Sequence, residues 1–289
     1  MKRYRGIVFI LIIILLFCLS YIFKWNIYYL LSNPYILISL FFLILILSLL
    51  SGFKIKLSIL ISILVVIGLF AFNVYLMRVD LKKGIFFSES ISERKEGEKE
   101  FLSNLMLTSG DLIVKETNGE NLFIFDYYSP IKLFYKFNRK KDTASFTAKD
   151  LNLFWSESPK NEWNFYINKD IKSKILIKGK VIKGNINLLE IPAKELNIKS
   201  NVLYLNMKIG RRETPIKINI NSTSFIGKIE IPKGFYVDVK FDSPHIILKG
   251  KNFKNIGAGR YVKEGKSGRI YISVKGKGTI LTIEEENNE

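Results

Sequence analysis

The sequence predicts a membrane α-helical N-terminal segment followed by an all-β domain, which is a β-solenoid or, as the alternative, a β-sandwich. Only 10 of the first 83 residues are charged, against 60 of the remaining 206. A single soluble core does not divide its charge in this way. The first part also contains three long uncharged stretches, and the second shows alternating apolar residues with a short internal repeat.

The uncharged stretches predict three transmembrane helices, at about 7–23, 34–53 and 57–77, within a membrane segment of residues 1–79. A spanning helix needs roughly 20 apolar residues, and the stretches contain 17, 19 and 21. Asn33 and Pro34 suit the N-cap and the first helical position of the second helix. A cleaved signal peptide is the competing interpretation of the first stretch, although no small-residue cleavage site follows it.

Basic residues near the predicted helix ends indicate the orientation. Lys2, Arg3 and Arg5 precede the first helix and only Lys24 follows it closely, which predicts a cytoplasmic N-terminus in a bacterial-type plasma membrane. An odd number of helices then places the β-domain outside the cytoplasm.

The C-terminal part is predicted as a charged linker at 80–100, a β-domain at 101–283 and a frayed acidic tail at 284–289. An edge strand is the alternative for the linker. Within 101–283 the apolar residues alternate, which is typical of strands with one buried face. The alternating sets are Leu105/Leu107, Leu112/Val114, Leu122/Ile124, Ile175/Ile177, Leu203/Leu205, Ile216/Ile218/Ile220, Ile229/Ile231, Val237/Val239, Ile270/Ile272/Val274 and Leu281/Ile283.

A repeat favours the solenoid over the sandwich. Leu-Glu-Ile-Pro at 189–192 recurs as Ile-Glu-Ile-Pro at 229–232, forty residues later. The alternating pairs Leu196/Ile198, Ile216/Ile218 and Val237/Val239 are spaced by 20 and 21 residues. A period near 20 suggests stacked turns of two short strands each. A sandwich would also show short strands with frequent turns.

Several motifs resemble a known family. Residues 105–114 (LMLTSGDLIV) and 122–127 (LFIFDY), followed by Trp163, Phe165 and Ile167, resemble the toast-rack β-domains and the adhesin-type β-solenoids. Behind membrane helices, such a domain resembles the bacterial cell-wall-antibiotic response (LiaF-like) family. The resemblance implies a non-enzymatic membrane protein of the envelope stress response that restrains a sensor kinase. Members commonly have four membrane helices, whereas three are predicted here.

No catalytic, cofactor-binding or metal-binding residue is predicted. Cys18 and His245 are the single cysteine and histidine, which excludes an internal disulfide and His/Cys zinc sites and argues against most triad hydrolases. The glycine-rich segments 257–259 and 276–279 match no nucleotide-binding pattern and are interpreted as turns. The aromatic-rich stretch 127–166 could form a carbohydrate or peptide platform, or its alternating residues could face the core.

The candidate binding residues are lysines that cluster in the sequence of the β-domain. Residues 84–289 contain 35 Lys and Arg against 25 Asp and Glu. Clustered lysines attract anionic lipid headgroups or wall polymers, or they protect sheet edges from unwanted pairing. The candidate anionic-surface contacts are Lys174, Lys178, Lys180, Lys183, Lys249, Lys251 and Lys254.

The sequence therefore predicts a non-enzymatic membrane protein that senses, scaffolds or regulates at the cell envelope. The alternative is a surface adhesin or a binder of anionic polymer or lipid headgroups, and an enzyme acting on wall glycan is the least favoured hypothesis. The expected partners are the lipid bilayer and either another membrane protein, such as a sensor kinase, or an anionic envelope polymer. Neither a cofactor nor nucleic acid is expected.

Overall fold

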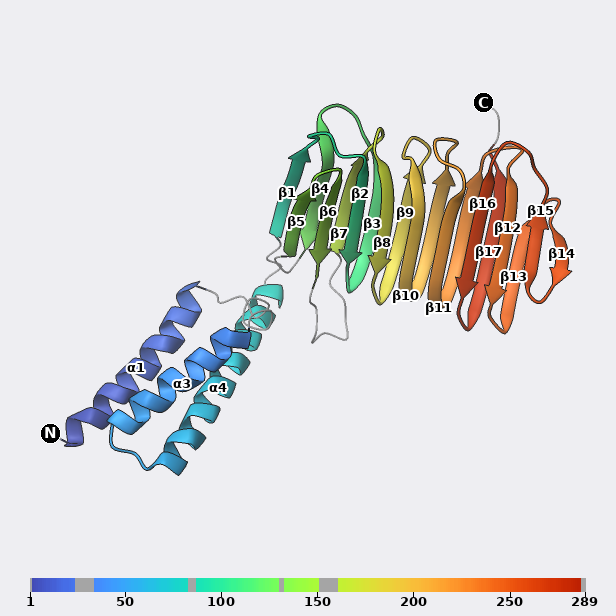
Figure 1. Ribbon diagram of the computed structural model, residues 1–289. Helices are drawn as coiled ribbons and strands as arrows, with labels where there is room; N and C mark the ends of the chain where they lie inside the picture. The colour runs from blue at the N-terminus through green and yellow to red at the C-terminus, as the bar shows by residue number, and fades with distance from the viewer. Residues whose placement is uncertain (1, 24–33, 83–86, 130–132, 151–160, 287–289) are drawn as a thin grey trace. The chain divides into compact units, whose positions relative to one another are not determined.

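The computed structural model describes residues 2–23, 34–82, 87–129, 133–150 and 161–286. The chain forms two compact units, Met1–Ile85 and Phe86–Glu289, which are drawn in Figure 1. The first unit is helical and the second is built from strands. The predicted division into a helical segment and an all-β domain is therefore present in the structure.

The helical unit contains α1 (Lys2–Phe23), α3 (Pro34–Leu50) and α4 (Ile55–Lys82). Pro34 is the first residue of α3, as predicted, whereas Asn33 lies outside the described residues. Within the described residues, only Ile55–Asn73 is long and apolar enough to cross a membrane; the apolar segments Phe9–Leu19 and Ile38–Leu50 are shorter. The structure thus supports one membrane-spanning helix and does not extend that support to the other two predicted spans.

Two polar side chains of α4 form hydrogen bonds within the helix. The Ser62 hydroxyl donates to the Ser58 carbonyl at 2.8 Å, and the Asn73 amide donates to the Leu69 carbonyl at 2.8 Å. Such bonds lower the cost of placing polar side chains in an apolar environment. They agree with a structural interpretation of Asn73.

The β unit contains seventeen strands, which are hydrogen-bonded into one mixed sheet. Their bounds are β1 Phe87–Arg94, β2 Glu100–Met106, β3 Ser109–Thr117, β4 Asn121–Ser129, β5 Phe134–Lys140, β6 Thr143–Lys149, β7 Asn161–Asn168, β8 Lys172–Lys178, β9 Val181–Leu188, β10 Ala193–Ile209, β11 Ile216–Ile231, β12 Tyr236–Asp242, β13 His245–Gly250, β14 Lys254–Gly257, β15 Arg260–Lys263, β16 Arg269–Lys275 and β17 Gly278–Glu285.

Two runs of parallel strands make up most of this sheet (Figure 1). In the first run the neighbours are β6, β2, β8, the first half of β10, the first half of β11, β16 and β12. In the second run they are β7, β3, β9, the second half of β10, the second half of β11, β17 and β13. Antiparallel strands extend the ends, so the sheet is mixed.

The hydrophobic core lies between the two runs. This is possible because the alternation of buried and exposed residues shifts by one position where a long strand passes from one run to the other. In β10, Ile198 and Ser200 are buried, and the next buried residue is Leu203. The odd step turns the side chains of both halves inward. Ser200 and Ser222 share a hydrogen bond of 3.0 Å at this corner. One chain thus builds both walls of a single hydrophobic core.

The register corrects the predicted repeat. Leu196 pairs with Ile175 and with Ile218, 21 and 22 residues away, and not with Ile216. Val237 pairs with Ile270, because β16 lies between β11 and β12. The predicted spacing is therefore close to the spacing in the structure. The predicted neighbour of Leu196, Ile216, lies two residues before the actual neighbour, Ile218. The recurring Ile-Glu-Ile-Pro motif is not structurally equivalent either, since 189–192 follows β9 whereas 229–231 lies inside β11.

The structure corrects three further predictions. The linker assignment of 80–100 is wrong for Phe87–Arg94, because this segment is β1 and pairs antiparallel with β4; the edge-strand alternative is correct. The acidic tail begins later than predicted, because Glu284 and Glu285 belong to β17. In β4 the buried rings are those of Phe123, Phe125 and Tyr127, so the predicted alternation through Ile124 has the wrong phase.

Candidate functional site

The first group of predicted lysines is divided between the two runs. Lys174 and Lys178 lie in β8 of the first run, Lys180 lies in the turn that follows, and Lys183 lies in β9 of the second run. Strands β8 and β9 both pair with β10, each with a different half. These four lysines therefore do not lie on one pair of hydrogen-bonded strands.

The structure instead forms what we call the corner cluster, Lys178, Lys180 and Lys199. Lys178 is in register with Lys199 of β10, and the Lys180 carbonyl accepts a hydrogen bond of 3.0 Å from the Asn201 amide at the corner. Adjacent strands lie about 4.8 Å apart and in-register side chains point the same way. Like charges at such a pair repel.

In the part of the chain that the structure describes, no member of the corner cluster has an ion-pair partner. Lys180 and Lys199 are exposed and Lys178 is half-buried. An anion bound here would relieve the repulsion between neighbouring ammonium groups. Lys199 was missed by the sequence analysis, because its neighbour across the sheet is 21 residues away in the chain.

The second group of lysines surrounds the end of the second run. Lys249 lies in β13, Lys251 in the following turn and Lys254 in β14, and all three are exposed. Among the described residues none of them has an ion-pair partner. This group is therefore available to an anionic partner.

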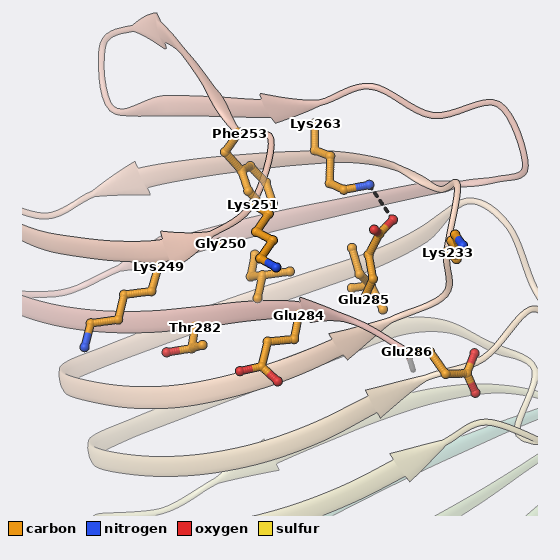
Figure 2. A pocket seen from close by; sticks show the side chains of 12 residues that line it. Lys233, Lys249, Gly250, Lys251, Phe253, Lys263, Thr282, Glu284, Glu285 and Glu286 are labelled. Atoms are coloured by element: carbon orange, nitrogen blue, oxygen red, sulfur yellow. Dashed lines mark hydrogen bonds and ion pairs between the residues drawn. The ribbon is translucent and has the colours of Figure 1, made fainter. Parts of the chain in front are cut away.

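A pocket of about 810 Å³ adjoins this group. Figure 2 shows Lys249 and Lys251 beside it, together with Lys233 and Lys263, which the sequence analysis missed. Lys254 is not part of its lining. The remaining lining residues come mainly from the ends of β11, β13 and β17: Ile231, Gly250, Phe253, Thr282, Ile283, Glu284, Glu285 and Glu286.

An ion pair between Lys263 in β15 and Glu285 in β17 links two of the strands that line this pocket. Lys263, which is only 6% exposed, donates to Glu285 Oε1 at 2.7 Å, as the dashed line in Figure 2 marks. The Gly234 amide donates to the same oxygen at 3.3 Å. The hydrogen bond from Lys263 lowers the pKa of the Glu285 carboxyl; the Gly234 amide and the charge of Lys233 act in the same direction, and burial opposes them.

Glu285 is expected to make the stability of the β unit pH-dependent. Its folded pKa is lowered from the ordinary value of 4.5, so its contribution is complete above that pH and is lost as the pH falls through the folded pKa. Glu285→Gln should cost about 1–2 kcal/mol at pH 7, less than a fully buried pair because the carboxylate is partly exposed. The measurement is urea unfolding of the full chain in detergent, followed by tryptophan fluorescence.

The difference between wild type and Glu285→Gln should shrink below pH 4.5, because the protonated wild-type carboxyl then resembles the amide. Glu264→Gln is the matched control, since no ion pair joins Glu264 to another described residue. A difference that stays constant from pH 7 to pH 3 would contradict the assigned role of the ion pair.

The single histidine and the glycine-rich segments lie in strands and in the turns between them. Within the described residues there is no group of three His, Cys, Asp or Glu that could hold a metal ion. His245 is an exposed residue at the start of β13. Gly276 lies in the turn between β16 and β17, where its amide donates to the Asp242 carbonyl at 3.1 Å. Gly257, the last residue of β14, and Gly259, in the turn that follows, have positive φ angles of 97° and 70°.

Part of the aromatic stretch belongs to the core. Tyr127, Trp163 and Phe165 are buried, and Phe125 meets Trp163 edge to face at 5.3 Å. Phe154 and Trp155 lie outside the described residues. The aromatic residues that remain on the surface are Tyr128, Phe134 and Tyr135. The core interpretation of this stretch is thus correct for the rings that alternate in β4 and β7.

The fold of the β unit resembles that of a solved structure. A crystal structure described as a "putative cell adhesion protein" from Clostridium sporogenes ATCC 15579 matches with a TM-score of 0.64 and 19% identity, covering 70% of this chain and 100% of that one. At this identity the likeness shows the fold alone.

Two structures described as a "putative adhesin", from Bacteroides fragilis NCTC 9343 and Parabacteroides distasonis ATCC 8503, share 12% and 11% identity. Each covers 68% of this chain and 97% of its own, with TM-scores of 0.27 and 0.24. No protein-family model matches the chain. No curated protein matches it either.

Proposed function

We propose that this chain is a non-enzymatic membrane protein that presents its β unit as a recognition surface at the cell envelope. Support comes from the apolar helix Ile55–Asn73 in one unit and from the adhesin-like fold of the other. In this proposal the two parallel runs act as a toast-rack-like β-solenoid. Backbone hydrogen bonds between successive strands keep such a stack rigid, so its surface groups are held in fixed positions.

The corner cluster is the observation that carries this proposal. Lys178, Lys180 and Lys199 lie at one corner of neighbouring strands and have no ion-pair partner among the described residues. A polymer with regularly spaced negative charges can neutralise such a row, and so can anionic headgroups at a bilayer surface. We propose an anionic envelope polymer as the main ligand, in agreement with the adhesin-like alternative.

Binding to a polyanion is expected to be sensitive to salt and to the corner cluster. The full chain in discs of neutral lipid should bind inorganic polyphosphate at about 0.01 M salt and release it at about 1 M, as the Debye length falls from about 30 Å to about 3 Å. The variant Lys178→Gln/Lys199→Gln should weaken binding at low salt by about tenfold, because each lost charge contact is worth roughly 0.2–1 kcal/mol at an exposed site and the two act together.

Lys217→Gln/Lys240→Gln is the matched control, because it removes the same charge from the first run, away from the corner and outside the candidate contacts. Equal losses in both double variants would overturn the assignment to the corner. Anionic vesicles in place of polyphosphate form a second arm: stronger binding to vesicles would favour lipid headgroups as the ligand.

The membrane arrangement is part of the same proposal: three spanning helices, a cytoplasmic N-terminus and an extracytoplasmic β unit. Basic residues before the first helix support this orientation. A tag after Glu289 should be lost when intact cells are treated with protease. Full protection of the tag would place the β unit in the cytoplasm and would change the number of spans.

The resemblance to the cell-wall-antibiotic response family adds a proposed partner, a sensor kinase in the same membrane. Anchoring in one bilayer raises the effective concentration of two such proteins for each other. Cross-linking in intact membranes is the measurement that tests this partner.

A further inference from the structure

Among the described strands, three of the four ends of the two parallel runs continue into antiparallel strands, so their outermost edges belong to β5, β14 and β1; the end at β13 does not. In the first run, β5 covers β6 at one end, and β15 followed by β14 covers β12 at the other. In the second run, β4 followed by β1 covers β7. In contrast, β13 pairs only with β17 among the described strands. Its outer edge therefore presents backbone groups that have no strand beside them.

The side chains of β13 also indicate an incomplete end. Ile246 and Leu248 point toward the core and pack against it, but they are only half-buried. The residues beside them in β17, Thr279 and Leu281, are buried. On the outer face, Ile247 is 51% exposed. A further strand beside β13 would bury Ile246 and Leu248 as β13 itself buries Thr279 and Leu281.

The neighbouring hairpin restricts what can occupy this edge. Strands β15 and β14 extend the first run two strands beyond β12, whereas the second run ends at β13 (Figure 1). The first run therefore extends further than the second, and we call the position beside β13, next to this projecting hairpin, the ledge. A second copy that met this end through its own β13 would bring the two projecting hairpins together, which disfavours a dimer at this edge.

The positive charge beside the free edge of β13 indicates that an added strand would be acidic. Lys249, Lys251 and Lys254 are exposed along β13 and the turn that follows it into β14. Of the acidic groups in the adjoining pocket, Glu284 pairs with Lys228 and Glu285 pairs with Lys263, whereas Glu286 has no ion pair with a described residue. An incoming acidic segment would therefore meet positive charge that has no partner among the described residues.

We propose that the free edge of β13 accepts an extended acidic polypeptide segment of a partner protein as an added strand. The backbone of that segment supplies the hydrogen bonds that the edge lacks, its apolar side chains cover Ile246 and Leu248, and its carboxylates face the lysines. A polyphosphate-like polymer can satisfy the lysines but supplies neither the backbone donors nor the apolar contacts. This proposal is independent of the polyanion-binding role of the corner cluster.

The test is hydrogen exchange of the β13 amides in the full chain, with a probe strand attached after Glu289. The probe is an eight-residue segment of alternating Val and Glu behind a Gly/Ser linker of about ten residues, which spans roughly 17 Å. Because Gly250 pairs with Ile283 near the end of β17, such a linker can reach β13. At the millimolar effective concentration of a short tether, exchange of those amides within Ile246–Gly250 that point away from β17 should slow by about tenfold.

Three comparisons separate the possible causes of protection. A probe with the same carboxylates but with proline in place of valine lacks the amide of every second residue and the valine side chains that would cover Ile246 and Leu248, so it should give clearly weaker protection. Lys249→Glu/Lys251→Glu should abolish protection by the Val/Glu probe, whereas Lys217→Glu/Lys240→Glu, the same charge change on the first run, should not. In the untagged protein, the β13 amides that point away from β17 should be unprotected at every protein concentration.

Absence of protection by the Val/Glu probe would overturn the proposal. Equal protection by the proline probe would also overturn it, in favour of a polyanion held by charge alone. Protection of β13 in the untagged protein that rises with protein concentration would assign the edge to a second copy of this chain. None of these outcomes affects the polyphosphate measurement at the corner cluster, so the two proposals can fail separately.

Discussion

Replacing Phe123 with alanine is expected to lower the free energy of unfolding of the β unit by about 3–5 kcal/mol. The Phe123 ring is fully buried and its centroid lies 4.4 Å from that of Phe146 and 5.4 Å from that of Phe101. It also contacts the rings of Phe137 and Phe165. The alanine variant leaves a cavity at the centre of this cluster, and each lost ring contact removes further favourable energy.

The measurement is urea unfolding of the full chain in detergent, with Phe134→Ala as the matched control. Phe134 lies in the edge strand β5 and is 48% exposed, so its truncation should change stability by less than about 0.5 kcal/mol. Similar losses in the two variants would show that the aromatic cluster is not the centre of the core.

The second large effect is expected at the turn between β16 and β17. A Cβ atom on Gly276 would lie 2.0 Å from the backbone oxygen of Ser222 in β11. A backbone atom cannot move aside as a flexible side chain can, so Gly276→Ala must separate the two stacked turns. We expect a loss near the upper end of the usual range for overpacking, about 3 kcal/mol.

Gly278→Ala is the control in the same turn. A Cβ atom there would meet nothing within 4 Å, and alanine reduces the freedom of the unfolded chain, so the variant should be neutral or more stable by about 0.4–1 kcal/mol. Thermal unfolding of the two variants side by side checks the prediction. If Gly276→Ala is as stable as Gly278→Ala, the close stacking of the two turns is wrong.

The candidate site was predictable only in part. Lys249 and Lys251 were selected from their crowding in the sequence, and the structure places both beside the pocket. Lys233 and Lys263 were missed because they come from other elements, and Lys263 is buried against Glu285. Lys199 joins Lys178 through a strand pairing that no local pattern reveals.

The sequence by itself determined the division into a helical and a β unit and the inward face of most strands. Charge distribution and period-two alternation are properties of contiguous residues, and they follow from which side chains must avoid water. The alternation was therefore correct where a strand has one clear apolar face, as in β11 and β16. It had the wrong phase in β4, where Phe123 and Phe125 compete with Leu122 and Ile124 for the core.

Only the tertiary structure decided the order of the strands. The insertion of β16 and β17 beside β11, ahead of β12 and β13, depends on hydrogen bonds between residues 54 positions apart, such as Ile216 and Ile270. A shift of two residues preserves the inward face, so hydrophobic patterning does not distinguish Ile216 from Ile218 as the neighbour of Leu196. The packing of whole strands selects the register, and with it the corner cluster, the pocket and the open edge of β13.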